Sequence, residues 1–472
     1  MEVKEKKKGK HDKSALATAP VKSIMAKMGL PIVLSMMFQA VYNIVDCAFL
    51  SKMSEGGEQA LTALGLAFPI QLLMVAVAIG TGVGANALIS KSLGQGNKNK
   101  ASRTVGNTIF LGIVIYVIFI IFGLAIVPAY VRSQSAGGAI SETVLTMAID
   151  YLRICCCVSF GIIFFSVFEK VLQSMGHSVC STTAQVTGAV VNIIFDPIFI
   201  YGLFGCPEMG VKGAAYATVL GQIASAAVAF GFHLKLDNDV DKSLKYIKPS
   251  LKIIKEIYAI GLPAIISQAL LSLMTCGLNM VLGQINEVGE NAVTVYGLYC
   301  KIQQLITFAA FGMRDAITPI VSFAYGMRNR KRIKEGIKYG LIYTTFLMVL
   351  GLVLIEAFAP VITSMFSLSD VTYDLCIGCI RIVSLALIFA GLNIALQGIF
   401  QAVECGIESL VISAGRQVVF VIPSAWLLAK FATGAENVSL IWWAFLIGET
   451  ITLICGVLMF KRAFKNKINS LQ

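Results

Sequence analysis

Two aspartates lie inside long apolar segments of this sequence, where a charged side chain is costly. Asp46 lies in the apolar segment 36–50, and Asp196 lies in the apolar segment 190–200. A charged side chain at the centre of a bilayer costs about 3 kcal/mol or more, so an acid in a membrane segment indicates a functional site.

Each aspartate shares a helix face with other polar residues. The first face has spacings of four, three and four residues and comprises Ser35, Gln39, Tyr42 and Asp46, with Asn43 beside it. The second face has spacings of seven and four and comprises Gln185, Asn192 and Asp196. Such spacings put side chains on one side of a helix, and polar sides turn away from lipid. Thr218 and Gln222 in the next apolar segment offer further oxygens.

Two carboxylates with amide and hydroxyl oxygens are suited to binding a small hard cation such as Na⁺. They also suit proton carriage, because desolvation and a neighbouring like charge favour the protonated carboxylic acid. The sequence leaves Na⁺ and H⁺ both open. A purely structural role, as a helix cap or ion-pair partner, is the alternative. The first half of the chain has few Lys or Arg within its apolar segments, which disfavours that role.

The composition predicts an all-α polytopic membrane protein. The chain is 57% hydrophobic and 14% charged, whereas about a quarter of the residues of a soluble protein are charged. Runs of about 20 apolar residues mark membrane-spanning helices. Twelve are predicted, at residues 24–50, 58–90, 105–128, 146–170, 179–203, 211–234, 253–284, 291–321, 338–360, 375–399, 407–430 and 438–460.

The net charge of +12 follows the predicted topology. Lys and Arg concentrate in both tails and in the loops after spans 2, 6 and 8, whereas the opposite loops are nearly free of them. This bias predicts a multi-pass protein of the plasma (cytoplasmic) membrane with both termini in the cytoplasm. It gives no reason to expect a nucleic-acid partner; membrane lipid is the expected surrounding, and we expect a monomer. With only three His in the chain, we expect no cofactor, no catalytic residues and no metal beyond Na⁺ bound at Asp46, Asn192 and Asp196.

The two halves of the chain repeat each other. Gly29-Leu30-Pro31 recurs as Gly261-Leu262-Pro263, an offset of 232, and the same offset runs without a gap to Asn97 and Asn329. Six spans per half make the repeats parallel, as in transporters that rock two bundles around a central cavity. The predicted divisions are a basic tail (1–23), an N-lobe (24–234), a linker (235–252), a C-lobe (253–460) and a second tail (461–472). Asp46 has Leu278 as its counterpart, so the ion site belongs to the N-lobe alone.

Other charges within the spans have less specific readings. Glu169 and Lys170 are predicted at the cytoplasmic end of span 4, and Arg314 and Asp315 are predicted to form a local pair. Candidate cavity-lining residues are Gln39, Asn43, Gln185, Gln222 and Lys301, although Lys301 could equally extend toward the membrane surface. The sequence assigns no function to Lys301, Arg314, Asp315, Glu356 or Glu449.

These features resemble the multidrug and toxic compound extrusion (MATE) family, and within it the DinF-like branch. The motifs that carry the resemblance are Tyr42-Asn43-Ile44-Val45-Asp46, Asn192-Ile193-Ile194-Phe195-Asp196-Pro197, Gly213-Ala214-Ala215-Tyr216-Ala217-Thr218 and residues 172–178. The resemblance implies twelve helices in two pseudo-symmetric six-helix bundles. It also implies a cation- or proton-coupling site at Tyr42, Asp46, Asn192, Asp196 and Thr218.

The resemblance further implies a secondary antiporter, not an enzyme. Such a protein exports small organic, often cationic or amphipathic, drugs or metabolites against inward H⁺ or Na⁺ by alternating access. Two alternatives stand beside it: a flippase for lipid-linked oligosaccharides or other lipids, and a polytopic membrane enzyme. A flippase would more often have a cationic cavity and extra spans. An enzyme would need a catalytic cluster in a loop, which the sequence lacks. The substrate, the coupling ion and the conformational state stay open.

Overall fold

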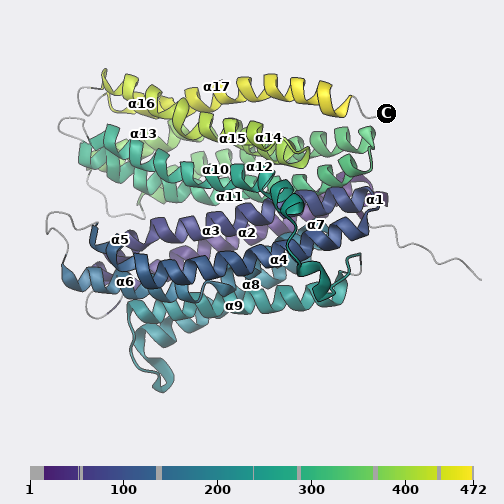
Figure 1. Cartoon of the computed structure of the whole chain (residues 1–472). Coiled ribbons are helices and arrows are strands. Elements are labelled where there is room, and N and C mark those ends of the chain that lie inside the picture. Colours follow the sequence, from purple (N-terminus) through teal and green to yellow (C-terminus); the bar gives the residue numbers. More distant parts are fainter. Residues whose placement is uncertain are drawn as a thin grey trace, which may run out of the picture.

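The computed structural model describes residues 15–51, 53, 57–133, 141–237, 239–283, 289–364, 370–432 and 437–469. Within these residues every regular element is a helix, and the long helices run side by side (Figure 1). The first half contains α1 (Ala15–Thr18), α2 (Val21–Ser51), α3 (Gly57–Gly94), α4 (Lys98–Ile121), η1 (Phe122–Ile126), α5 (Val127–Ser133), α6 (Glu142–Cys157), α7 (Phe160–Ser174), α8 (Ser178–Tyr201), η2 (Leu203–Gly205) and α9 (Val211–Leu236).

The second half follows the short turn η3 (Leu244–Ile247) and has a similar order of elements. It contains α10 (Leu251–Gly283), α11 (Gly289–Gly326), α12 (Arg330–Ser364), α13 (Asp370–Ser384), α14 (Leu387–Ala402), α15 (Gly406–Ala414), η4 (Gly415–Val419), α16 (Val421–Ala429), α17 (Ser439–Ala463) and η5 (Phe464–Ile468). Figure 1 shows α2–α9 in the lower part of the view and α10–α17 in the upper part.

The predicted number of spans is confirmed when each bent helix pair is taken as one span. Ten spans of the described residues are long and apolar enough to cross a membrane. Two further spans are pairs: α6 with α7, bent by 45°, and α13 with α14, bent by 47°. The bends fall within the predicted spans 146–170 and 375–399, where the hydropathy pattern continues across the break.

Apolar side chains cover the outer faces of the helices. Large exposed hydrophobic residues recur along α4 and α12, among them Ile118, Ile121, Phe346, Val353 and Phe358. Apolar patches of this extent would aggregate in water but are stable in hydrocarbon. The chain is therefore a multi-pass membrane protein.

The contact between the two halves is symmetric. A Cβ atom added to Gly94 of α3 would lie 2.1 Å from the carbonyl oxygen of Phe323 in α11. A Cβ atom on Gly326 would lie 2.1 Å from the carbonyl oxygen of Lys91. Gly94 and Gly326 are counterparts in the repeat, with an offset of 232, and so are Lys91 and Phe323. The same backbone surface is thus used twice, as in a two-fold interface.

A second pair of contacts obeys the same relation. Gly80 of α3 approaches Ile265 of α10, and Gly312 of α11 approaches Val33 of α2. Both partners are again related by the offset of 232. Helices α2 and α3 therefore pack on α10 and α11 around a pseudo-two-fold axis. The glycines make this possible, because a side chain at these positions would meet the neighbouring helix.

Candidate cation site in the first half

Helices α2 and α8 bring the two aspartates together. The carboxyl groups of Asp46 and Asp196 are direct neighbours, close enough to share a hydrogen bond when one of them is protonated. Asp46 is 9% exposed and Asp196 is fully buried. Two carboxylates in direct contact repel each other, so this arrangement requires either a shared proton or a bound cation.

Polar contacts on both sides of the pair hold α2 and α8 in register. Toward one end, Tyr201 of α8 donates a hydrogen bond to the carbonyl oxygen of Phe49 in α2, at 2.6 Å. Toward the other end, the Gln185 amide donates to Gln39 Oε1 at 3.0 Å. The Ser35 hydroxyl donates to Gln185 Oε1. The aspartates lie between these two sets of contacts, which fixes which residues of the two helices face each other.

Several oxygens at the site lack a hydrogen-bond partner. Asn192 donates its amide to Asp196 Oδ1 at 3.1 Å. Among the described residues, no partner is found for four buried oxygens: Asp46 Oδ1, Asn192 Oδ1, Asp196 Oδ2 and Thr218 Oγ1. Buried polar atoms are normally paired, so unpaired oxygens indicate a place for a ligand. Carboxylate, amide and hydroxyl oxygens are the donor set of a hard cation.

Close packing of α8 on α9 positions Thr218. A Cβ atom on Gly188 would lie 1.8 Å from Ser225 Oγ, and one on Gly221 would lie 2.6 Å from the carbonyl oxygen of Gly188. The two glycines let the helix backbones meet. Asn192 and Thr218 then lie on neighbouring helices at similar depth.

Two polar residues of the site escaped the sequence analysis as site residues. Tyr151 of α6 is buried close to Asp46 and to Thr218. Gln71 of α3 donates its amide to the Tyr151 hydroxyl at 3.0 Å. Gln71 is a lone polar residue among apolar turns, and the residues three and four positions from Tyr151 are Met147, Ala148, Ile154 and Cys155, so no polar spacing pattern marks either residue. With them, the site draws on α2, α3, α6, α8 and α9.

The other predicted residues have varied placements. Gln39 and Gln185 join the site through their hydrogen bond. Gln222 of α9 faces α7, because its Cβ atom is 2.9 Å from the position that a Cβ atom added to Gly161 of α7 would take. The side chains of Tyr42, Asn43 and Lys301 lie outside the described residues.

The described part of the second half has no matching pair of acids at the corresponding place. Leu278, the counterpart of Asp46, is buried in an apolar cluster. A buried acid of this half is Glu449, and Arg416 binds its Oε1 through Nε and Nη2 at 2.9 and 2.8 Å. Asn393 donates to Glu449 Oε2 at 2.7 Å. Glu449 is therefore fully paired, unlike the acids of the first half.

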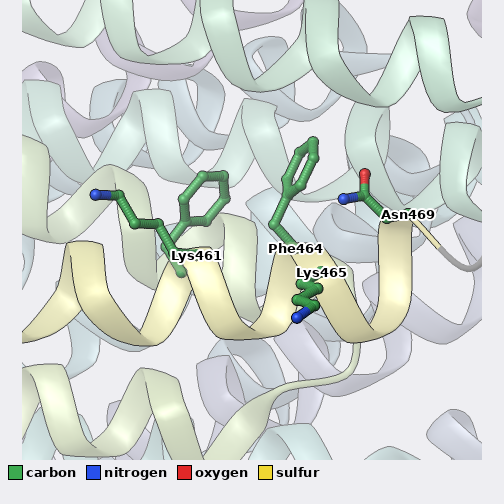
Figure 2. A pocket seen from close by; sticks show the side chains of 5 residues that line it. Lys461, Phe464, Lys465 and Asn469 are labelled. Atoms are coloured by element: carbon green, nitrogen blue, oxygen red, sulfur yellow. The ribbon is translucent and has the colours of Figure 1, made fainter.

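One surface pocket lies away from this site. It has a volume of about 360 Å³ and is formed at the C-terminal end of α17 and in η5 by Phe460, Lys461, Phe464, Lys465 and Asn469 (Figure 2). None of the predicted site residues lines it. Among the described residues, no group of three or more His, Cys, Asp or Glu side chains is arranged to hold a metal ion.

The chain matches the MatE family over residues 31–198 and 263–427. The two matched segments begin 232 residues apart, the offset of the internal repeat. The chain is 23% identical over 443 residues to the multidrug export protein MepA of Staphylococcus aureus, covering 93% of this chain and 94% of that protein.

Solved structures of similar fold include an outward-facing multidrug resistance MATE family transporter of the MOP superfamily. It has a TM-score of 0.89 and 27% identity, and covers 98% of this chain and 100% of the other. A MOP superfamily transporter from Pyrococcus furiosus, whose binding pocket is described as reversed in polarity, has a TM-score of 0.85 and 27% identity. It covers 97% of this chain and 100% of the other.

Proposed function

Because this chain belongs to the MatE family and is a multidrug efflux transporter rather than an enzyme, we propose that it exports small organic compounds in exchange for a cation that binds at Asp46 and Asp196. The relatives' description as multidrug exporters supports small organic substrates. The acidic character of the site favours cationic or amphipathic ones.

The contact between the two carboxyl groups carries the proposal and favours the proton as coupling ion. Asp46 and Asp196 are neighbours in a buried place, and no Lys, Arg or His of the described residues forms an ion pair with either. One shared proton stabilises this arrangement. Na⁺ is the competing ion, supported by the unpaired oxygens of Asn192 and Thr218.

Loss of the cation would leave two buried carboxylates side by side. Their repulsion would push α2 away from α8, and α2 also packs against α11 and α12 of the other half. A change at the site is thereby passed to the interface between the halves. We propose that the halves act as the predicted lobes, 24–234 and 253–460, which rock in alternating access in a monomer with both termini in the cytoplasm.

Efflux of ethidium from cells tests the role of the two acids. Asp46→Asn and Asp196→Asn should each abolish export while the protein still inserts, as verified by size-exclusion chromatography. Asp150→Asn is the matched control, because Asp150 forms a partly exposed ion pair with Lys212 at 3.0 Å. Efflux at the wild-type rate in either site variant would refute the proposal.

A further inference from the structure

A buried cluster of charged and amide side chains joins the two halves. It lies where the C-terminal half of α7 meets α11 and comprises Glu169, Lys170, Gln173, Arg314 and Asp315. All five side chains are buried. The sequence places Glu169 and Lys170 near a helix end and Arg314 and Asp315 in a local pair, but it gives no sign that the two groups touch.

Lys170 and Asp315 form the link between the halves. Lys170 Nζ lies 2.5 Å from Asp315 Oδ2, and the side chains are 1% and 3% exposed. Glycines make room for the two cations: a Cβ atom on Gly82 would lie 2.7 Å from Lys170 Cγ, and one on Gly398 would lie 2.8 Å from Arg314 Cγ. The pair is thus built into the packing and not formed by two flexible surface chains.

Each partner of this pair has a second partner in its own half. Lys170 Nζ lies 3.7 Å from Glu169 Oε2 and donates to Gln173 Oε1 at 3.1 Å. Asp315 Oδ1 lies 2.9 Å from Arg314 Nη2 and accepts from Arg314 Nε at 3.0 Å. If the halves separate here, Lys170 keeps an acid and Asp315 keeps a base. The charges within the cluster therefore balance in each half by itself.

This balance matters because a buried ion without a partner is strongly destabilising. A single pair across the interface would make separation of the halves very costly. A second partner on each side lowers that cost. The direct contact between Lys170 and Asp315 still favours the closed state, in which the two halves meet at this cluster. The partly exposed pair Lys91–Glu404, at 2.6 Å, also crosses between the halves. An exposed pair contributes little by comparison.

We infer that Lys170 and Asp315 form a reversible latch that closes this end of the interface during transport, and that Glu169 and Arg314 hold the two charges when the latch opens. The inference rests on the proposed alternating access. It predicts opposite effects for two neutralising substitutions in one cluster. Asp315→Asn removes the latch and favours opening. Glu169→Gln removes the partner that receives Lys170 and favours closure.

A cysteine substituted for Ser322 can report opening. The Ser322 side chain is fully buried, and its hydroxyl donates to the carbonyl oxygen of Ala87 across the interface at 2.9 Å. Thr344 is a matched control. It is equally buried and donates to the carbonyl oxygen of Gly340 within α12 at 2.8 Å.

The experiment measures the rate at which a maleimide labels the introduced thiol of the full-length Ser322→Cys protein, read by peptide mass spectrometry so that native cysteines do not interfere. Asp315→Asn should raise this rate by about tenfold, because the Lys170–Asp315 contact stabilises only the closed state and the loss of a buried charged contact is worth at least a tenfold step in an equilibrium. Glu169→Gln should lower it. Labelling of the introduced thiol of Thr344→Cys should not follow either change. Lys170→Gln should act like Asp315→Asn and replaces it if that variant does not yield folded protein.

Opposite shifts in the labelling of Ser322→Cys, with the labelling of Thr344→Cys unaffected, support the latch. Shifts in the same direction, or none, overturn it, because general loosening of the fold would raise both rates. The result is separable from the proposed coupling site. If the labelling rates do not shift as predicted, the latch is refuted, but the effect of Asp46→Asn on efflux still tests the coupling site. If Asp46→Asn instead shows normal efflux, the coupling site is refuted, but the labelling rates still test the latch.

Discussion

Gly84→Ala should force α3 and α10 apart at the interface between the halves. A Cβ atom at Gly84 would lie 2.1 Å from the carbonyl oxygen of Ile257 and 3.0 Å from the backbone nitrogen of Gly261. Both obstacles are backbone atoms of one helix, so no side chain can rotate away. Ordinary contact begins near 3.4 Å, so the helices must move apart locally by about 1 Å.

Two opposing effects set the magnitude. Overpacking of this kind costs about 1–3 kcal/mol. Alanine is a better helix former than glycine by about 1 kcal/mol. The net loss of stability is then about 0–2 kcal/mol. The functional loss should be larger, because the substitution disfavours the closed interface directly and the proposed alternating access requires both states.

Thermal unfolding of purified protein and ethidium efflux measure the two effects. Gly65→Ala is the control: it lies in the same helix, and no atom lies within 4 Å of the added Cβ. The control should transport normally and unfold at the same or a slightly higher temperature. If Gly84→Ala matched Gly65→Ala in both assays, the close approach of α3 and α10 would not describe the working protein.

Three further substitutions probe the contacts around the buried acids. Tyr201→Phe removes the hydrogen bond that joins α8 to α2 and should slow efflux severalfold. The control Tyr216→Phe changes an exposed side chain and should not slow efflux, so equal rates in the two variants would refute the importance of the Tyr201 hydrogen bond. Asn192→Leu removes an amide that orients a carboxylate and should weaken cation dependence of transport about tenfold; an unchanged cation titration would contradict this. Glu449→Gln leaves Arg416 unpaired in the second half and should cost about 3 kcal/mol in stability, seen as a lower unfolding temperature; a loss of coupling without destabilisation would argue against a structural pair.

The spans, the repeat and the two acids follow from the sequence because they depend on local patterns. Hydropathy marks apolar helices, and an ungapped offset of 232 marks a duplication. The spacing of Asn192 and Asp196 puts them on one face whatever surrounds them. The family profile repeats at the same offset.

Contacts between distant helices could not be derived in this way. Tyr151 and Gln71 meet because α6 and α3 pack against each other. Lys170 reaches Asp315 across 145 positions, and the short spacing of Arg314 and Asp315 suggested only their local pair, which the structure also contains. The breaks between α6 and α7 and between α13 and α14 left no trace in hydropathy, because apolar residues occupy both sides of each bend.

Ion-driven transport by purified protein in lipid vesicles tests the central claim most directly. H⁺ and Na⁺ gradients would be imposed separately, and movement of a fluorescent organic cation would be followed for wild type and for the variant with both Asp46→Asn and Asp196→Asn. We predict that a proton gradient drives the wild-type protein and has no effect on the variant. Gradient-driven transport by the variant at the wild-type rate would contradict the assignment of coupling to these two acids.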